Sequence, residues 1–340
     1  MRARIKDGYN FMSKLSLNKV LNFSILLLSY YISKFLKKDL SKGMPFSISI
    51  EPTTSCNLRC PECPSGLRSF TRPTGMLTDE VFTKVIDELG PTLTYLIFYF
   101  QGEPYLNPNF LKLVRYAHDK KIYTATSTNA HYLNSQKAEE TVRSGLDRLI
   151  ISIDGTTQDT YESYRVGGSL DKVLEGTKNI IAAKRKLKSA KPYVIFQFLV
   201  VKPNEHQIAE VYNLAREYGV DEVKLKTAQI YDYEKGSDLI PEQGKYARYK
   251  KNQQGEYTIK NALEHSCWKM WHGAVVTWDG KVVPCCFDKD ATHQLGSVAH
   301  TSFKQVWHSA AYRHFRQSII KSRSEIEICK NCTEGTKVFF

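Results

Sequence analysis

The sequence predicts an α/β protein built on a parallel sheet or an incomplete barrel. Six strand-like runs recur along the chain, and several are almost wholly apolar, as parallel strands buried on both faces are. Helical runs lie between them, and such repeated units are joined by right-handed crossovers within one sheet. Six units are fewer than the eight of a closed barrel. The runs are residues 46–50, 94–100, 123–127, 147–153, 194–200 and 222–226.

Two of the intervening segments carry clear helix-end signals. Residues 78–89 begin with Thr78 as N-cap, place apolar side chains on one face and are followed by a Gly-Pro pair. Residues 205–218 repeat this scheme, with Gly219 as the stop. Both segments are therefore predicted to be helices that pack one face on the sheet.

The last third of the chain has a different pattern. Residues 231–262 are polar and lack periodicity, which is typical of a linker. Residues 273–285 are two β-rich runs around Asp279-Gly280, a pair typical of the type I′ turn of a hairpin. A helix is expected over about 301–320.

The first 45 residues concentrate the positive charge of the protein. They hold nine Lys and Arg against two acidic residues, which is +7 of the formal net charge of +13. Residues 14–38 predict a helix that is too short and too polar to span a membrane. Two interpretations stay open: an interfacial helix on an anionic membrane, or an amphipathic helix packed on the main domain. The remainder shows no basic stripe interleaved with aromatic residues, so nucleic acid is not an expected partner.

Eight cysteines fall into an early and a late group. The apolar run near Val20 is not followed by a small-residue cleavage site, so a cytoplasmic protein is expected, with membrane association through residues 14–38 as one interpretation. Closely spaced cysteines in that compartment indicate metal binding and not disulfides. The cysteines are Cys56, Cys60, Cys63, Cys267, Cys285, Cys286, Cys329 and Cys332.

The early group has the spacing Cys56-x3-Cys60-x2-Cys63 and directly follows the first predicted strand. Three thiolates in one loop can face a single metal centre. A structural zinc site takes four protein ligands, whereas three cysteines on a [4Fe–4S] cluster leave one iron open. The spacing by itself leaves a zinc site completed by a distant histidine as an alternative.

The segment CNLRCPEC, residues 56–63, resembles the cluster loop of the radical S-adenosylmethionine (SAM) superfamily. This resemblance implies a partial (β/α)6 TIM-type barrel with a [4Fe–4S] cluster on the three cysteines. It implies that the open iron chelates the amino and carboxylate groups of SAM. It further implies reductive cleavage of SAM to a 5′-deoxyadenosyl radical, which abstracts hydrogen from a substrate.

Further segments resemble the family in the same order. Gln101-Gly102-Glu103-Pro104 is similar to the GGEP motif, which contacts the methionine amino group, although Gln101 replaces the first glycine. Residues 127–129 are similar to the STNG segment near the nucleoside, with Ala130 in place of the last glycine.

The resemblance also assigns roles after the fourth strand. Ser152 and Asp154 are expected to approach the ribose and the substrate, and Arg165 is expected to pair with the methionine carboxylate. The full set of expected cofactor-binding residues is Gly102, Glu103, Ser127, Asn129, Ser152, Asp154 and Arg165.

The late cysteines, taken as residues alone, allow either zinc or an iron–sulfur cluster. Their block resembles the SPASM or "twitch" extension of this superfamily, a small β-hairpin-plus-helix domain. The resemblance implies a second, auxiliary [4Fe–4S] cluster on Cys267, Cys285, Cys329 and Cys332. Cys286 is left over. Strand alternation predicts that it faces away from the cluster as a buried apolar thiol.

The predicted organisation has four parts. They are an amphipathic N-terminal helical segment (1–43), the radical SAM core barrel (44–235), a linker (236–262) and the SPASM/twitch domain (263–340).

The expected function is oxidation of a small or sugar-like molecule, with the auxiliary cluster accepting an electron and an external reductant such as flavodoxin or ferredoxin. A peptide-modifying SPASM maturase is one alternative. Such relatives often carry a peptide-recognition domain before the barrel, whereas the residues here predict a helix. Two non-catalytic alternatives are an iron–sulfur electron carrier and a zinc-dependent nucleic-acid-binding module.

Overall fold

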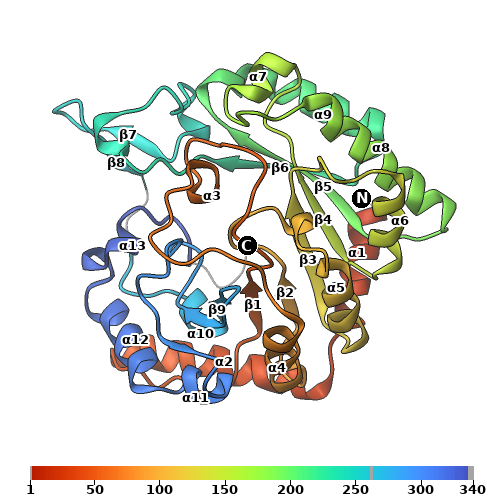
Figure 1. Cartoon of the computed structure of the whole chain (residues 1–340). Coiled ribbons are helices and arrows are strands. Elements are labelled where there is room, and N and C mark those ends of the chain that lie inside the picture. Colours follow the sequence, from red (N-terminus) through yellow and green to blue (C-terminus); the bar gives the residue numbers. More distant parts are fainter. Residues whose placement is uncertain (1, 261–262, 336–340) are drawn as a thin grey trace.

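The computed structural model describes residues 2–260 and 263–335 and is organised around one large sheet. Nine strands lie in the order β11-β10-β9-β1-β2-β3-β4-β5-β6 (Figure 1). All neighbours from β9 across to β6 are parallel, and β10 is antiparallel to both β9 and β11. The α/β prediction with a mostly parallel sheet is therefore confirmed.

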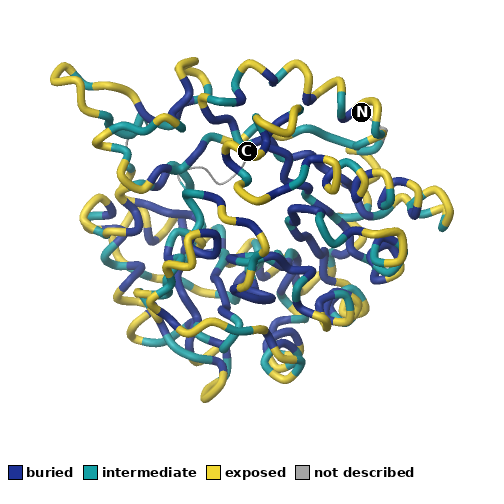
Figure 2. Tube along the Cα trace, turned by 45° about the horizontal axis from the view of Figure 1, so that its top comes forward, coloured by how far each residue is buried: buried dark blue, intermediate teal, exposed yellow. Residues whose placement is uncertain are grey.

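All six predicted barrel strands form at the expected places. The first five contain buried residues, whereas the sixth, at the edge of the sheet, has only half-buried and exposed ones; Figure 2 colours the trace by burial. The strands are β1 (Ser47–Ile50), β2 (Tyr95–Ile97), β3 (Tyr123–Thr128), β4 (Arg148–Ser152), β5 (Tyr193–Val200) and β6 (Glu222–Thr227).

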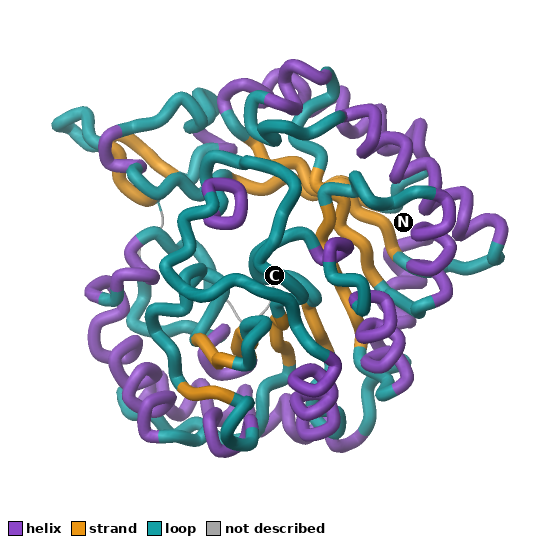
Figure 3. The backbone as a smooth tube through the Cα atoms, viewed as in Figure 1, coloured by secondary structure: helices purple, strands orange, loops and turns teal. Residues whose placement is uncertain are grey.

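Helices follow these strands and lie outside the sheet, as Figure 3 shows. Thr78 caps the helix predicted over 78–89, since its side chain accepts a hydrogen bond from the backbone N–H of Val81. The helices between β1 and β6 are α3 (Pro64–Leu67), α4 (Asp79–Leu89), α5 (Phe110–Asp119), α6 (Ser135–Arg143), α7 (Gln158–Glu162), α8 (Leu170–Lys186) and α9 (Ile208–Tyr218).

The C-terminal hairpin continues the barrel sheet, which differs from the expectation of a separate small domain. β9 (Gly273–Val276) pairs in parallel with β1 from Ser47↔Gly273 to Ile50↔Val276. An incomplete barrel leaves its first strand with an open edge, and an added strand satisfies the free backbone groups there. The other strands of this part are β10 (Lys281–Val283) and β11 (Gly296–Ser297).

The hairpin turn is not of the predicted type I′. That turn needs positive φ at both central residues, and of the hairpin residues only Gly280, at 82°, has it. Thr277 accepts a hydrogen bond from the N–H of Gly280 (2.9 Å) and donates to the carbonyl of Lys281 (2.9 Å). The turn is therefore a longer loop with its glycine in the left-handed region.

Two other predictions need correction. The segment predicted as a linker folds in part, because β7 (Tyr249–Lys251) and β8 (Tyr257–Ile259) form a separate antiparallel pair. The single helix expected over 301–320 is two, because Ser309 starts a new helix as its N-cap. The helices of this part are α10 (Lys269–His272), α11 (Phe303–Trp307), α12 (Ala310–Ser322) and α13 (Glu327–Lys330).

Two helices precede the sheet. α2 (Leu17–Leu36) confirms the helix predicted over 14–38, and α1 (Arg2–Met12) is a second, separate helix within the helical segment predicted over 1–43. In Figure 1, α2 crosses the lower part of the molecule next to α10 and α12, and α1 lies beside β3, β4 and β5.

A buried ion pair links the barrel to the hairpin. Arg72 donates to both oxygens of Glu51, at 2.8 and 2.5 Å, and both side chains are at least nine-tenths buried. The N–H of Trp278 donates to the same carboxylate at 3.3 Å. The end of β1, the segment after the cluster loop and the hairpin are thus held by one carboxylate.

We expect Arg72→Met to lower the free energy of unfolding by about 3 kcal/mol, because it leaves the carboxylate of Glu51 buried without its cation. Chemical denaturation measures this change. Arg115→Met is the matched control, because Arg115 lies 3.9 Å from Asp119 in an exposed pair, and its effect should stay below about 0.5 kcal/mol. Equal effects of the two substitutions would contradict the assignment.

Candidate active site

The three early cysteines lie in the loop after β1, on the wall of a cavity of about 230 Å³. The loop turns back tightly onto α3. A Cβ atom at Gly66 would stand 2.6 Å from both the backbone N and O of Cys60, so only glycine fits at that position. The thiols of Cys56, Cys60 and Cys63 are thereby presented from one short segment to one cavity.

The loop after β2 is fastened to the cysteine loop through backbone groups. Gly102 has φ of +75°, and a Cβ atom there would lie 2.2 Å from the carbonyl oxygen of Thr53. Its N–H donates to Oγ of Ser65 (2.9 Å), and the N–H of Glu103 donates to the carbonyl of Ser55 (2.8 Å). The glycine of the GGEP-like motif therefore allows the loop after β2 to approach the cysteine loop closely.

Gln101, which stands where the family motif has glycine, is also placed at the cysteines. Its Oε1 lies 3.8 Å from the Sγ of Cys63, and its side chain is buried. In this contact the Cys63 thiol is the donor and the amide oxygen is the acceptor.

Glu103 is buried in the wall of the cavity and accepts three hydrogen bonds. They come from the N–H of Asn129 (2.8 Å), the hydroxyl of Thr128 (2.8 Å) and the N–H of Tyr105 (3.3 Å). Burial raises the pKa of Glu103 to about 7, against the lowering effect of these donors. The Asn129 side chain in turn donates to Asn57 at 2.8 Å, which joins the ends of β1, β2 and β3.

Arg165 reaches the cavity from the segment after β4. Its Nη1 lies 3.8 Å from the Sγ of Cys60, and its Nε donates to Asp154 at 2.5 Å. Asp154 is fully buried, and its second oxygen accepts from the N–H of Leu199 at 2.7 Å. Asp154 does not line the cavity, which differs from the expectation that it approaches the ribose; it is a positioning residue for Arg165.

The structure thus brings together six of the seven predicted cofactor-binding residues. Ser127 and Ser152, at neighbouring strand ends, have their hydroxyl oxygens 3.4 Å apart. The lining residues among those predicted are Gly102, Glu103, Ser127, Asn129, Ser152 and Arg165, together with the three cysteines.

This set of groups fits a [4Fe–4S] cluster with SAM. Within residues 2–260 and 263–335, no three thiol, imidazole or carboxylate groups converge closely enough for a single metal ion. Three thiols that line one cavity leave one iron of a [4Fe–4S] cluster open, and they are one ligand short of a structural zinc site. Such a cluster, when bound, supplies the electron that cleaves SAM to a 5′-deoxyadenosyl radical.

The late cysteines gather around an arginine that the sequence analysis missed. Arg323, 1% exposed, donates to the Sγ of Cys332 at 3.3 Å and to the carbonyl of Ser266 at 2.8 Å. Burial lowers the pKa of Arg323, but charge interactions with Cys267, Cys332 and Cys329 raise it above the ordinary value. No local pattern distinguishes this arginine from others on helices, so no sequence signal could have found it.

Cys285 and Cys286 follow the end of β10. Burial raises the pKa of Cys285, whose thiol also interacts with those of Cys267 and Cys332. Cys286 is exposed, which corrects the prediction of a buried apolar thiol. β10 ends at Val283, so strand alternation does not apply to the two cysteines.

The aromatic residues near Cys267 pack in the core. Trp268 and Trp271 are buried, and the His272 ring lies 5.0 Å from the Trp268 ring. Burial lowers the pKa of His272 to about 4. His293 packs against Phe315 at 5.5 Å.

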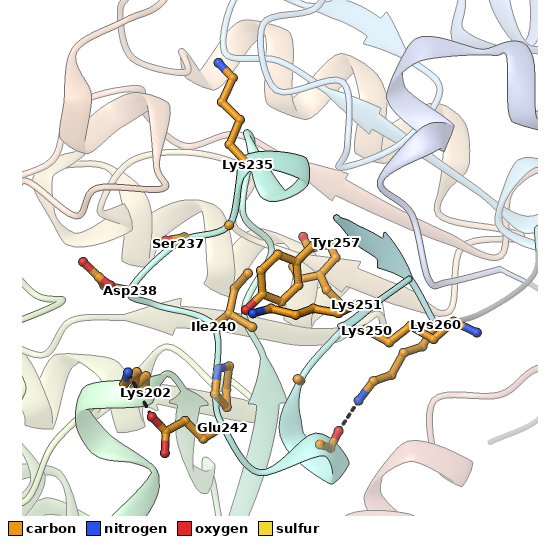
Figure 4. Close-up of a pocket in the computed structure, with 15 residues that line it drawn as sticks. Lys202, Lys235, Ser237, Asp238, Ile240, Glu242, Lys250, Lys251, Tyr257 and Lys260 are labelled. Carbon is orange, nitrogen blue, oxygen red and sulfur yellow. Dashed lines mark hydrogen bonds and ion pairs between the residues drawn. The ribbon is translucent and has the colours of Figure 1, made fainter. Parts of the chain in front are cut away.

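A larger cavity, of about 750 Å³, lies within the segment from Lys202 to Lys260 (Figure 4). Five lysines line it, but Lys202 pairs with Glu242 at 2.9 Å and Lys260 bonds the carbonyl of Gly244. None of the predicted site residues faces this cavity. Its lysines belong to a solvated surface, and the chemistry lies in the smaller cavity at the strand ends.

A loop of three thiols, with a carboxylate and a guanidinium in one cavity of an incomplete barrel, defines an iron–sulfur enzyme that acts on a small cosubstrate. Family models agree with this class. Residues 50–215 match the radical SAM superfamily, and residues 267–333 match the SPASM iron–sulfur cluster-binding domain. The chain belongs to the radical SAM superfamily and carries a C-terminal SPASM domain.

Curated relatives are similar over most of their length. The tungsten-containing aldehyde ferredoxin oxidoreductase cofactor-modifying protein of Pyrococcus furiosus is 26% identical over 299 residues, covering 78% of this chain and 82% of the relative. The AdoMet-dependent heme synthase of Methanosarcina barkeri is 24% identical over 328 residues, covering 85% and 91%.

Solved structures share the fold. BtrN in complex with AdoMet and 2-DOIA has a TM-score of 0.53 at 17% identity, covering 87% of this chain and 95% of BtrN. SuiB of Streptococcus suis bound to SAM has a TM-score of 0.62 at 14% identity, covering 85% and 72%. At these identities the likeness concerns the fold alone.

Asp154→Asn is expected to weaken SAM binding about tenfold without changing the iron content, because Arg165 loses the charged partner that orients it. Equilibrium binding to the anaerobically reconstituted protein measures this. Asp159→Asn, an exposed substitution on α7, is the control and should bind SAM normally. Unchanged affinity in Asp154→Asn would remove the positioning role.

SAM affinity is expected to rise about tenfold from pH 6 to pH 8 through ionisation of Glu103. With its pKa at about 7, the Glu103 carboxyl is mostly protonated at pH 6 and mostly a carboxylate at pH 8. The carboxylate is the better acceptor for the methionine amino group. Glu103→Gln cannot ionise at this position, so the pH dependence of its SAM affinity reflects the titration of SAM alone. If SAM affinity depends on pH in the same way in both proteins, Glu103 does not control SAM binding by its ionisation.

Proposed function

We propose that this enzyme oxidises a small, hydroxylated, sugar-like molecule. Hydrogen abstraction removes the first electron from the substrate, and an auxiliary [4Fe–4S] cluster on Cys267, Cys285, Cys329 and Cys332 takes up the second. The SAM-binding cluster is assigned to Cys56, Cys60 and Cys63. An external one-electron reductant such as flavodoxin or ferredoxin starts the reaction.

The observation that carries this proposal is the buried guanidinium of Arg323 among the late thiols. A fixed cation favours the more negative, reduced state of a neighbouring redox group, since Coulomb interactions are strong in a buried site. Arg323 therefore makes this position suitable for accepting an electron.

The electron balance is that of a dehydrogenation. The substrate gives one hydrogen atom to the 5′-deoxyadenosyl radical, then one electron to the auxiliary site and one proton to solvent. That electron can return to the SAM-binding site, so the reductant is needed only to prime the reaction. The products are methionine, 5′-deoxyadenosine and a substrate with two hydrogens fewer.

The small-molecule class has two supports. The hydroxyl group of Ser152, which is expected to approach the substrate as well as the ribose, lines the cavity and suits a hydroxylated partner. The BtrN structure, which has this fold, was solved in complex with AdoMet and 2-DOIA. Similarity to the PqqA peptide cyclase of Gluconobacter oxydans covers 56% of this chain and 51% of that protein, so it gives less support to a peptide substrate.

Anaerobic reconstitution is expected to give about eight irons per chain, and about four for the double variant Cys329→Ala/Cys332→Ala. The variant should still release 5′-deoxyadenosine from SAM but should form no oxidised product. Cys286→Ala is the matched control and should keep the wild-type iron content.

The substrate class is tested with aminocyclitols and sugars under limiting dithionite, with mass spectrometry of the products. The expected result is a product two mass units lighter, formed in excess of the electrons supplied. Turnover that consumes one supplied electron each time, or turnover only with peptides, would overturn the proposed oxidation.

A further inference from the structure

The outward faces of α1 and α2 form an apolar surface. Among the described residues, thirteen of the eighteen large apolar side chains that are exposed lie between Ile5 and Leu40. Phe35 is 85% exposed, and Tyr9 and Leu17 are each 73% exposed. We call the following residues the apolar face: Ile5, Tyr9, Met12, Leu17, Val20, Leu21, Ile25, Leu28, Tyr31, Ile32, Phe35 and Leu36.

The inward face of α2 is mixed: Leu26 and Tyr30 are buried in the core, and polar side chains next to them bond to the domain. Lys19, 3% exposed, donates from Nζ to the carbonyl of Lys121 at 2.7 Å. Asn22 exchanges two hydrogen bonds with the backbone of Met44, each 2.8 Å long. These contacts fix which side of α2 faces the domain, so α2 cannot roll its apolar side inward.

Both helices pack at the amino-terminal ends of the parallel strands. α1 places Asp7 against Arg148, the first residue of β4, and its Asn10 donates to Asp147 at 2.9 Å. α2 places the Phe23 ring 4.9 Å from the ring of Phe46, next to the start of β1. The cavity lies at the opposite, carboxy-terminal ends of the strands. The apolar face therefore points away from the opening of the site.

The charge around the apolar face is positive. Asp7 is buried in its ion pair with Arg148, and Asp39 is half-buried. Lys34 pairs with Glu264 at 3.0 Å, while other basic side chains lie exposed at both ends of the helix pair. The exposed basic residues are Arg4, Lys6, Lys34, Lys37, Lys38 and Lys42.

Within the described residues, no single helix has the length and hydropathy needed to cross a membrane. Residues Ala3–Met12 and Leu17–Leu36 meet those criteria only as a pair bent by 94°. Polar side chains of α2 bond it to the domain. These contacts favour an α2 that lies along the bilayer surface.

We propose that the apolar face is a docking surface for an anionic phospholipid bilayer. The apolar side chains enter the boundary between headgroups and acyl chains, and the basic residues at the two ends contact anionic headgroups. A helix on the surface of a soluble protein turns its large apolar side chains toward the core. Here they are exposed, so burying them gains free energy only through an apolar partner outside the protein. In this orientation the catalytic cavity opens toward the aqueous side, which is where the substrate enters.

Flotation with vesicles tests the proposal on the full, reconstituted protein. Binding to vesicles of phosphatidylglycerol and phosphatidylcholine should be at least about tenfold stronger than binding to phosphatidylcholine alone, and it should weaken with added salt. The triple variant Ile25→Glu/Leu28→Glu/Phe35→Glu should lose at least about tenfold of the binding to anionic vesicles. Substitutions are preferable to deletion of residues 1–43, because deletion exposes the beginnings of the strands.

Two control variants separate the contributions. Tyr212→Glu places the same charge on α9 at a side chain 43% exposed, and it should float like the unmodified protein. Lys37→Glu/Lys38→Glu should weaken binding to anionic vesicles while leaving the weak binding to phosphatidylcholine unchanged. Iron content and release of 5′-deoxyadenosine should be unaltered in all variants, because none of these residues is near the cavity.

Two results would overturn the proposal. One is flotation of the triple variant equal to that of the unmodified protein. The other is a stable dimer in light scattering that the triple variant abolishes, without any vesicle binding by the unmodified protein; that result would assign the apolar face to a second copy of the chain.

Discussion

The parallel pairing of β1 with β9 is the contact on which the rest of the structure depends. β1 bonds to β2 on one side and to β9 on the other, so the barrel and the hairpin that leads to Cys285 share one sheet. The early cysteine loop leaves the end of β1, and Glu51 there binds both Arg72 and the hairpin. A shift of this register would move the two cysteine groups relative to each other. It would thereby change the distance over which an electron passes between them.

Each cysteine group has one largely buried arginine beside it. Arg165 lies against Cys60, and Arg323 lies against Cys332. Burial disfavours thiolates, as the pKa of Cys56, raised to about 12, shows. A cation next to the sulfur offsets this cost, and so would a cluster that takes the thiolates as ligands. The difference between the two arginines is their partner: Arg165 is neutralised by Asp154, whereas Arg323 bonds mainly to backbone carbonyls and sulfur.

The two ends of the parallel strands have separate tasks. Their carboxyl ends supply the cavity, where loops converge and backbone groups are free to bind a ligand. Their amino ends are covered by α1 and α2, which hydrogen-bond to the residues just before β1, β3 and β4. This division lets the outer side of α2 be apolar without touching the catalytic residues, so a surface for docking and a site for chemistry can coexist in one small fold.

The sequence by itself determined the six barrel strands, the helix capped by Thr78 and the three-thiol loop, because these depend on local periodicity, caps and spacing. It also indicated six residues that line the cavity, because they lie in segments that resemble family motifs within or after β2, β3 and β4. Only the tertiary structure decided the β1–β9 pairing, the pairing of Asp154 with Arg165 and the position of Arg323. Those contacts join segments remote in the chain or residues without a local signal. Which side of α2 faces inward was decided in the same way, because its buried polar partners, such as the carbonyl of Lys121, belong to distant loops.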